Sequence, residues 1–218
     1  DVMLADQSTL TNWLLPIIEA NQQPYKNGEL RLDNPDYWVL YTMEAMAISP
    51  EKLDSGLVCF YLFNIVHLKE GEGIFQDAGI PHAYLRGQNV ELMACSDNVI
   101  RGGLTPKYVD IVELLKIVDC REVTPKIISA APQNQSEFTY KTPVNDFALA
   151  QIRVEPEMHT KVNLQSAGIL LVMQGELKIQ EKSTALTLKQ GESAFITADS
   201  NVEIMSEKGG YAFLAKLP

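Results

Sequence analysis

A dense group of ionisable and polar side chains lies between residues 82 and 107. His82 follows a proline at the start of an expected strand, so its ring would be held at the wall of a barrel with one nitrogen free to bind a metal ion. Arg101 directly precedes two glycines, whose missing side chains let a small molecule approach closely. The segment therefore contains residue types suited to metal binding and to contact with a small substrate.

These residues also have structural interpretations. A single histidine is more often structural than a ligand, and by position alone Arg101 would form a surface ion pair. Cys95 lies in the same segment, but no histidine is evident beside it, which favours a small buried residue over a nucleophile. The apolar run Val90, Leu92 and Met93 is expected in a barrel core.

The composition is that of a soluble globular protein. The chain has 218 residues, of which 46% are hydrophobic and 21% charged, with 28 acidic and 18 basic residues and a net charge of −10. Its longest aliphatic stretch, residues 169–173, is far below the roughly 20 residues of a membrane span. An acidic chain without clustered lysine and arginine also argues against nucleic-acid binding.

Cysteine usage favours a reducing, cytoplasmic compartment. Cys59, Cys95 and Cys120 form no CxxC pair and have no secretory-type spacing. The sequence begins at Asp1 without an initiator methionine or a signal peptide. We therefore expect a chain that begins within a longer protein or has been trimmed.

Residues 1–56 are expected to form a small helical region. Apolar residues within 10–18 follow the spacing of one helical face, and Pro16 is expected to kink or split that helix. The dipeptides Asn34-Pro35 and Ser49-Pro50 each combine a capping side chain with a proline, which is typical of a helix start.

The rest of the chain is expected to be mainly β. Residues 57–106 open with a long β-branched and aromatic run over 57–68, and would form the terminal strands of a barrel. Residues 107–140 would form a helix, capped by Asp110, and a linker. Residues 141–218 would form a C-terminal jelly-roll domain.

An internal repeat indicates two barrels of one design. Residues 68–78 align with residues 188–198, with Leu, Lys, Gly, Glu, Phe and Ala in common. A Gly-Glu turn that enters a strand is typical of a jelly-roll corner, and the phenylalanine is expected to face inward. Only the first copy continues into a histidine, His82, so only the first barrel could bind a metal at this position.

The first barrel is short of strands. A jelly roll needs about eight strands, yet helices occupy the sequence before Leu57. Either residues upstream of Asp1 complete the barrel, with the helical region as an insertion, or another chain supplies the missing half. The missing initiator methionine favours the first explanation.

Residues 82–107 resemble the signature of the type I phosphomannose isomerase family. They match the pattern HAYLxG followed by ExMAxSDNxxRAGxTPK at every fixed position except Gly102, where the family has alanine. The similarity extends through the helical region and through the corner at 191–196. The resemblance implies a partial catalytic cupin barrel, interrupted by a helical domain and followed by a second jelly roll.

The resemblance also implies roles for individual residues. His82 would be a zinc ligand, Arg101 the catalytic arginine of the sugar-phosphate pocket, and Lys107 a phosphate ligand. The family pattern places three further substrate-binding candidates in or beside that pocket: Glu91, Tyr84 and Asp97.

The family's remaining zinc ligands are not found in this sequence. They come from a Gln-x-His motif and from a glutamate in an Asn-His-Lys-Pro-Glu motif, and His67 and His159 match neither. A catalytic Zn²⁺ usually has three protein ligands and an open position. The chain thus supplies one ligand, and the others are expected upstream of Asp1.

The implied activity is that of a zinc-assisted aldose-ketose isomerase. It would interconvert mannose 6-phosphate and fructose 6-phosphate through an enediol, feeding mannose metabolism and GDP-mannose synthesis. The isolated chain would be inactive without the upstream part of the same polypeptide or a complementary chain. The alternative is a non-catalytic sugar-phosphate-binding or structural cupin module. An upstream Gln-x-His motif would favour the enzyme, and a start codon near Asp1 would favour the module.

Overall fold

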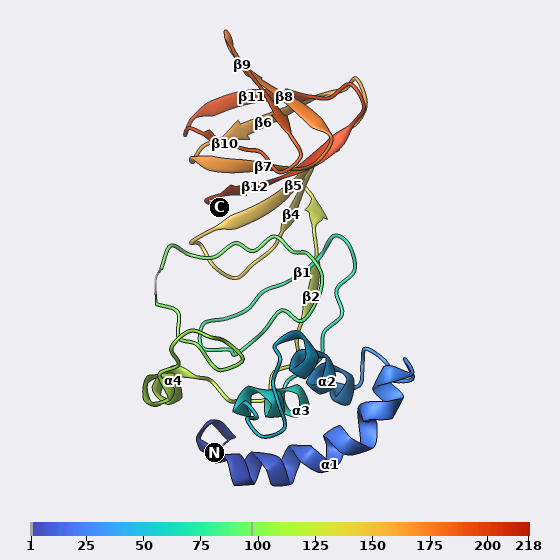
Figure 1. The fold of residues 1–218 in the computed structure, drawn as a ribbon. Coiled ribbons are helices and arrows are strands. Elements are labelled where there is room, and N and C mark those ends of the chain that lie inside the picture. Colours follow the sequence, from blue (N-terminus) through green and yellow to red (C-terminus); the bar gives the residue numbers. More distant parts are fainter. Residues whose placement is uncertain (1, 97) are drawn as a thin grey trace. The chain divides into compact units, whose positions relative to one another are not determined.

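The computed structural model describes residues 2–96 and 98–218, which form two compact units (Figure 1). The first unit contains the described residues of 1–67, 76–89 and 97–125, and the second contains residues 68–75, 90–96 and 126–218. Among the described residues, the helices lie in the first unit and the strands all lie in the second. The expected fold class, mainly β with a small helical region, is confirmed. No helix in the described part of the chain is long and apolar enough to cross a membrane.

Helix α1 (Gln7–Lys26) is capped by Asp6, whose carboxylate accepts a hydrogen bond from the Thr9 amide at 2.8 Å. Pro16 does not split the helix, which continues through it, and the kink expected there remains a prediction. Pro16 and Asn12, the residue whose carbonyl loses its helical partner, are both exposed, so water can satisfy that carbonyl.

Two further helix starts behave differently. Asn34 caps α2 (Pro35–Ala45) through its side chain, as expected. Ser49-Pro50, by contrast, begins only a single turn, closed by the Lys52 amide and the Ser49 carbonyl at 3.0 Å. The helix expected there is therefore wrong. Leu53, three residues beyond Pro50, is buried in the core of the helical region, and this burial ends the turn.

The strand expected over residues 57–68 is also wrong. Its first residues form a 3₁₀ helix, Ser55–Val58, and a short α-helix, α3 (Cys59–Leu62). Leu57 and Phe60 are buried three residues apart, a helical spacing, against the core built by α1 and α2. Within the described residues of 57–106, only β1 (Glu72–Ile74) is a strand.

Helix α4 (Ile111–Ile117) confirms the helix expected after Asp110, whose carboxylate accepts a hydrogen bond from the Glu113 amide at 3.0 Å. The domain boundaries proposed at 56, 106 and 140 remain predictions. The two compact units interleave along the chain, since residues 68–75 and 90–96 of the second unit lie between stretches of the first.

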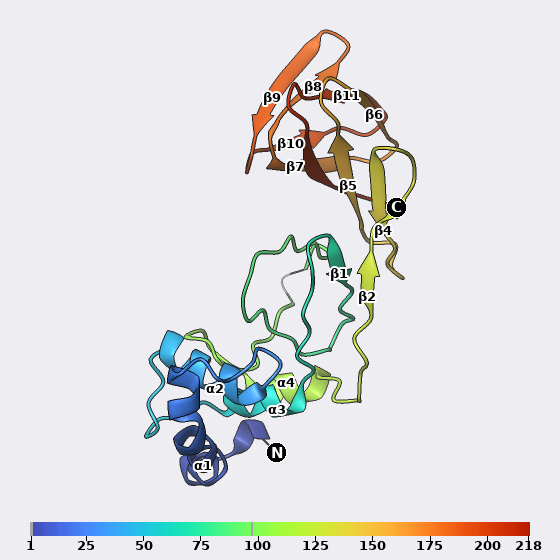
Figure 2. The same ribbon diagram turned by 90° about the vertical axis from the view of Figure 1, so that its right-hand side faces the viewer.

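The second unit is a jelly-roll sandwich. One sheet has six strands in the order β10-β7-β12-β5-β4-β3, and the other has four in the order β6-β11-β8-β9. Strands β1 and β2 form a separate antiparallel pair, side by side in both views (Figures 1 and 2). The strands other than β1 are β2 (Ile127–Ser129), β3 (Ala131–Pro132), β4 (Glu137–Tyr140), β5 (Ala148–Val154), β6 (His159–Leu164), β7 (Gly168–Gln174), β8 (Glu176–Glu181), β9 (Thr184–Lys189), β10 (Ser193–Ile196), β11 (Ser200–Met205) and β12 (Gly210–Lys216).

Alternating apolar residues of both sheets fill the space between them. Strands β7 and β8 are separated by Gly175, whose φ of +85° a residue with a side chain rarely adopts. Fully buried members of this core are Ala150, Ile152, Leu170, Val172, Leu177, Ile204, Ala212 and Leu214.

The repeated corner has the same geometry in both copies. The Glu72 amide donates to the Lys69 carbonyl at 3.0 Å, and the Glu72 carboxylate accepts from the Lys69 amide at 2.8 Å, with Gly71 at φ +79°. In residues 189–192 the corresponding distances are 2.9 and 2.8 Å, with Gly191 at φ +85°. We call this arrangement the glutamate-clamped turn.

The expectation of an inward phenylalanine is wrong in the second corner. Phe195 is 68% exposed, whereas Ile196 is buried in the sandwich core. Successive side chains of a strand point to opposite faces, so burial of Ile196 turns Phe195 outward. Phe195 lies opposite Ile169 of β7, which is also exposed.

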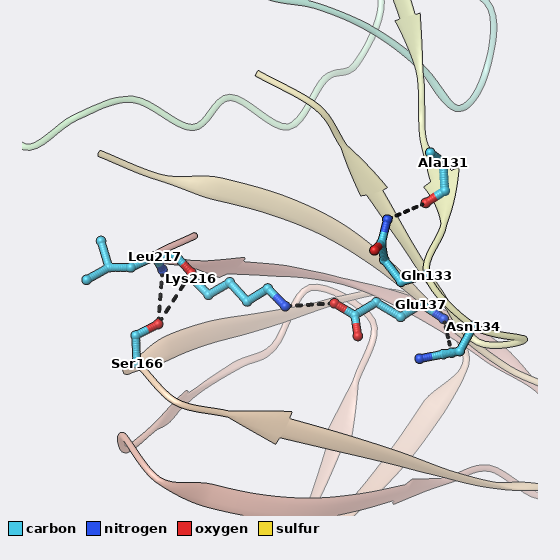
Figure 3. Close-up of polar contacts among 7 residues, drawn as sticks. All are labelled: Ala131, Gln133, Asn134, Glu137, Ser166, Lys216 and Leu217. Carbon is cyan, nitrogen blue, oxygen red and sulfur yellow. Dashed lines mark hydrogen bonds and ion pairs between the residues drawn. The ribbon is translucent and has the colours of Figure 1, made fainter. Parts of the chain in front are cut away.

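A partly buried ion pair joins two strands of the six-stranded sheet that are not adjacent. Lys216 of β12 donates to Glu137 of β4 at 2.7 Å, and their side chains are only 22% and 15% exposed (Figure 3). Strand β5 lies between β12 and β4 in the sheet. The residue of β5 paired with Lys216 is Ala148, and the residue paired with Glu137 is Ile152.

Candidate functional site

The segment that carries His82 is held against the end of α4. The Asp119 amide donates to the Gly79 carbonyl at 2.8 Å, and Gly79 has φ +79°. A Cβ atom on Gly79 would lie 2.9 Å from the Ile117 carbonyl oxygen, so the close approach requires glycine. The turn fixes the chain two residues before Pro81.

His82 is exposed, and its Nδ1 lies 2.9 Å from the Ile80 carbonyl oxygen. A carbonyl can only accept, so Nδ1 carries the proton in this contact, and in the neutral ring the lone pair is then on Nε2. This is the tautomer in which metal-binding histidines are commonly oriented. The ring of Tyr84 meets the His82 ring edge-on, with 5.9 Å between ring centroids.

Arg101 and Lys107 lie on one loop of the first unit, and both side chains are exposed. Gly103 and Leu104 have φ angles of +132° and +48°, so the loop reverses directly after Arg101. The Lys107 amide donates to the Thr105 hydroxyl at 3.2 Å, which fixes the far end of the loop. The two cations therefore flank a loop whose glycines leave backbone accessible, a chemistry suited to a small anion.

The structure places the remaining predicted site residues separately. Glu91 is exposed and belongs to the second unit, whereas His82, Tyr84, Arg101 and Lys107 belong to the first. Asp97 lies outside the described residues. The assignment of these side chains to one pocket remains a prediction.

Two further predictions for this region are wrong. Cys95 is exposed rather than buried, and Met93 is 52% exposed rather than part of a barrel core. Both residues lie where the described chain has no strands, so no sheet covers them. A third cysteine, Cys59, is not suited to nucleophilic chemistry at neutral pH, because burial, with a contribution from the Asp54 charge, raises the pKa of its thiol.

The described residues contain no group of three or more His, Cys, Asp or Glu side chains that could hold a metal ion. His82 is exposed, and its Nδ1 contact leaves Nε2 available as a zinc ligand. Zinc therefore fits His82 as one ligand, but the described part of this chain does not complete a zinc site.

Sequence reasoning missed Asp54, which reaches the loop after Arg101. The Asp54 carboxylate accepts a hydrogen bond from the Leu104 amide, fifty positions along the chain. In the sequence, Asp54 lies two residues before Gly56, a spacing typical of an Asx turn. This local pattern does not predict a contact with a residue as distant as Leu104.

Comparison with known proteins connects both units to one family. The family model for the cupin domain of mannose-6-phosphate isomerase matches residues 136–208. The chain is 42% identical over 149 residues to the mannose-6-phosphate isomerase of Escherichia coli K12, and this match covers 68% of the chain and 38% of the relative. The human mannose-6-phosphate isomerase is 35% identical over 159 residues, covering 69% of the chain and 38% of the relative. The chain belongs to the mannose-6-phosphate isomerase family.

Solved structures of mannose-6-phosphate isomerase from Salmonella typhimurium have the same fold over nearly the whole chain. The apo form is 31% identical with a TM-score of 0.72, covering 98% of this chain and 56% of that chain. The form bound to substrate (f6p) and a zinc atom is 30% identical with a TM-score of 0.66, covering 97% of this chain and 61% of that one. The matched part of the chain thus spans 38% of the length of these curated relatives and fits their C-terminal portion.

Proposed function

We propose that this chain is the C-terminal portion of a zinc-dependent mannose-6-phosphate isomerase, which interconverts mannose 6-phosphate and fructose 6-phosphate. The observation that carries the proposal is the fold shared, over 97% of the chain, with a phosphomannose isomerase structure bound to fructose 6-phosphate and zinc. The activity would require residues beyond this chain, because its described residues contain no group of three or more side chains that could hold the zinc ion.

In this proposal, His82 holds one position of the zinc through Nε2. The Ile80 carbonyl keeps the other ring nitrogen protonated and fixes the plane of the ring. When bound, zinc supplies Lewis-acid polarisation of substrate oxygens. Tyr84, whose ring packs edge-on against His82, would limit the rotation of the histidine and contact the substrate beside it.

Arg101 and Lys107 would provide local positive charge in a chain whose net charge is negative. Movement of a carbonyl between C1 and C2 passes through an enediol, on which negative charge develops at oxygen. The guanidinium of Arg101 can stabilise that charge, and Lys107 can hold the phosphate as a remote anchor. Because the chain has a net charge of −10, local attraction by these two cations must overcome general repulsion of an anionic substrate. Glu91 and Asp97 are proposed as further substrate contacts.

The test is a coupled assay of fructose 6-phosphate formation by the longer isomerase that contains this chain. We expect Arg101→Ala to lower kcat by about 100-fold or more, the usual effect of removing a group that stabilises developing charge. The matched control is Arg31→Ala, which removes an arginine paired with Asp33 on the surface of the same unit and should change kcat less than about twofold. Near-normal turnover in Arg101→Ala would exclude the proposed role.

The same assay applied to the 218-residue chain separates the two candidate functions. The described residues do not complete a metal site. This favours the second candidate function, in which the chain by itself is a non-catalytic module that binds sugar phosphates. We expect no turnover from the 218-residue chain with added zinc. Zinc-dependent turnover by this chain alone would show that no other polypeptide is needed, and stable co-purification with a separate subunit would indicate a complementary chain.

We further propose a cytoplasmic enzyme that feeds mannose metabolism and GDP-mannose synthesis. The three cysteines are free thiols in the structure, as a reducing compartment would keep them. A pulse of labelled fructose 6-phosphate in a cell extract should label both mannose 6-phosphate and GDP-mannose, and loss of the isomerase should abolish both labels.

A further inference from the structure

Asp54 connects the helical region to the loop that carries Arg101. Its Oδ1 atom accepts a hydrogen bond from the Gly56 amide at 2.7 Å, which begins the 3₁₀ helix. The same carboxylate accepts from the Leu104 amide, with both oxygens at 3.4 Å. One side chain therefore joins two segments that are fifty residues apart in sequence and lie in the same unit.

Leu104 needs this support because of its backbone conformation. Its φ of +48° lies in the left-handed region, which costs a residue with a side chain about 1 kcal/mol or more. The Leu104 side chain packs against the core of the helical region, so burial and the hydrogen bond from its amide both hold the strained residue. Without them, the chain after Gly103 would relax to another conformation.

The packing around Asp54 is tight enough to define one position for the loop. A Cβ atom on Gly56 would lie 2.8 Å from Cγ of Leu104 and 2.9 Å from Oδ1 of Asp54. A Cβ atom on Gly103 would lie 3.2 Å from the same Asp54 oxygen. The two glycines thus let the backbone approach the carboxylate closely. We call Asp54, Gly56, Gly103 and Leu104 the loop latch.

Arg101 is three residues from Leu104 and directly precedes the two glycines of the loop. Gly102 and Gly103 have no side chains that could pack and hold this part of the loop. The backbone position of Arg101 therefore depends on the anchored residue, Leu104. We infer that Asp54 is a positioning residue, which fixes the Arg101 guanidinium through the loop latch for the isomerase reaction. This inference rests on the proposed function, and the Asp54 carboxylate itself touches neither substrate nor metal in it.

The experiment compares Asp54→Ala with Asp6→Ala. Asp6 is a matched control, because it also caps a helix with its carboxylate in the same unit but bonds the Thr9 amide and not the Leu104 amide. In the longer isomerase, we expect Asp54→Ala to lower kcat about 10-fold to 100-fold with little change in KM, as for a misplaced catalytic group. Asp6→Ala should leave kcat per folded molecule within about twofold. Asp54→Asn keeps an acceptor oxygen and should restore most of kcat.

Hydrogen exchange of the Leu104 amide in the 218-residue chain provides a readout that does not depend on activity. We expect exchange to be at least about tenfold faster in Asp54→Ala than in wild type and unchanged in Asp6→Ala. Unchanged exchange in Asp54→Ala would overturn the latch. Faster exchange with an unchanged kcat would overturn the positioning role while the proposed function stands. A wild-type isomerase without turnover would overturn the proposed function and the positioning role together, and the exchange result would still decide the latch.

Discussion

At the scale of single residues, two tyrosines of the helical region donate hydrogen bonds to carboxylates. Tyr25 donates to Glu44 and Tyr61 to Asp36, each at 2.8 Å. Burial, followed by the hydrogen bond and charge of Glu44, raises the pKa of Tyr25 from 10.0 to about 12. Burial and Asp36 likewise raise the pKa of Tyr61. Both phenols therefore stay protonated in solutions where an unfolded tyrosine would ionise.

The raised pKa of Tyr25 predicts a pH-dependent effect of Tyr25→Phe. The contribution of the phenol is fully present below pH 10, the unfolded value, and is lost as the pH rises through about 12. We expect Tyr25→Phe to lower the free energy of unfolding by about 0.5 kcal/mol at pH 8, a small value because the site is partly solvated. The deficit should shrink between pH 10 and 12 in urea titrations.

Tyr108→Phe is the control for this measurement, since Tyr108 is 83% exposed. Its unfolding free energy should follow that of wild type at every pH. A deficit of Tyr25→Phe that stayed constant up to pH 12 would contradict the assigned cause.

At the scale of elements, the glutamate-clamped turn is a self-contained structure. In both copies a glutamate side chain satisfies the amide at the start of the turn, and a glycine adopts the positive φ at its third position. We expect Glu192→Ala to lower the free energy of unfolding by about 1 kcal/mol, as for loss of a side-chain cap. Glu207→Ala, which removes an exposed carboxylate from another turn, should change it by less than about 0.5 kcal/mol.

Thermal unfolding of the two variants, followed by circular dichroism, would check this prediction. Glu192→Gln provides the second comparison, because its amide oxygen can still accept from the Lys189 amide. Equal stability of Glu192→Ala and Glu192→Gln would show that the clamp does not stabilise the turn.

Elements with local signals could be predicted from sequence, and elements that depend on distant partners could not. Asn34 and Asp110 marked helix starts correctly because a cap bonds to amides within three residues. The β character expected for the C-terminal part was also correct, with β5 to β12 between residues 148 and 216. The β-branched run over 57–68 became helical at its start because burial of Leu57 and Phe60 against α1 and α2 decided its conformation.

At the scale of the whole molecule, the candidate site was only partly predictable. The segment 82–107 is contiguous, so a sequence pattern could indicate His82, Arg101 and Lys107 together. The pattern could not reveal Asp54, because its contact with Leu104 arises from folding across fifty positions. The same limit applies to the zinc site, whose further ligands no local pattern in this chain supplies.

The Lys216–Glu137 pair links segments that are 79 residues apart, and it predicts non-additive mutational effects. We expect Lys216→Met and Glu137→Gln each to lower the free energy of unfolding by about 1–2 kcal/mol, because each leaves a partly buried group without its partner. The double variant should lose less than the sum, with a coupling of at least about 0.5 kcal/mol.

Urea titration of the four proteins in a double-mutant cycle measures this coupling. The exposed pair Lys116–Glu113, with side chains 63% and 46% exposed, is the control, and its cycle should give less than about 0.5 kcal/mol. Additive effects at Lys216 and Glu137 would show that the pair contributes nothing specific.

The glutamate-clamped turns also have a consequence for the order of folding. Each turn closes its hydrogen bonds within four residues, so little chain entropy opposes its formation. Pairing of β12 with β5 joins segments more than fifty residues apart and must wait for a much larger loop to close. The corners are thus expected to form early, reversing the chain before the sheets assemble, and substitution of Glu192 should slow refolding more than substitution within β12.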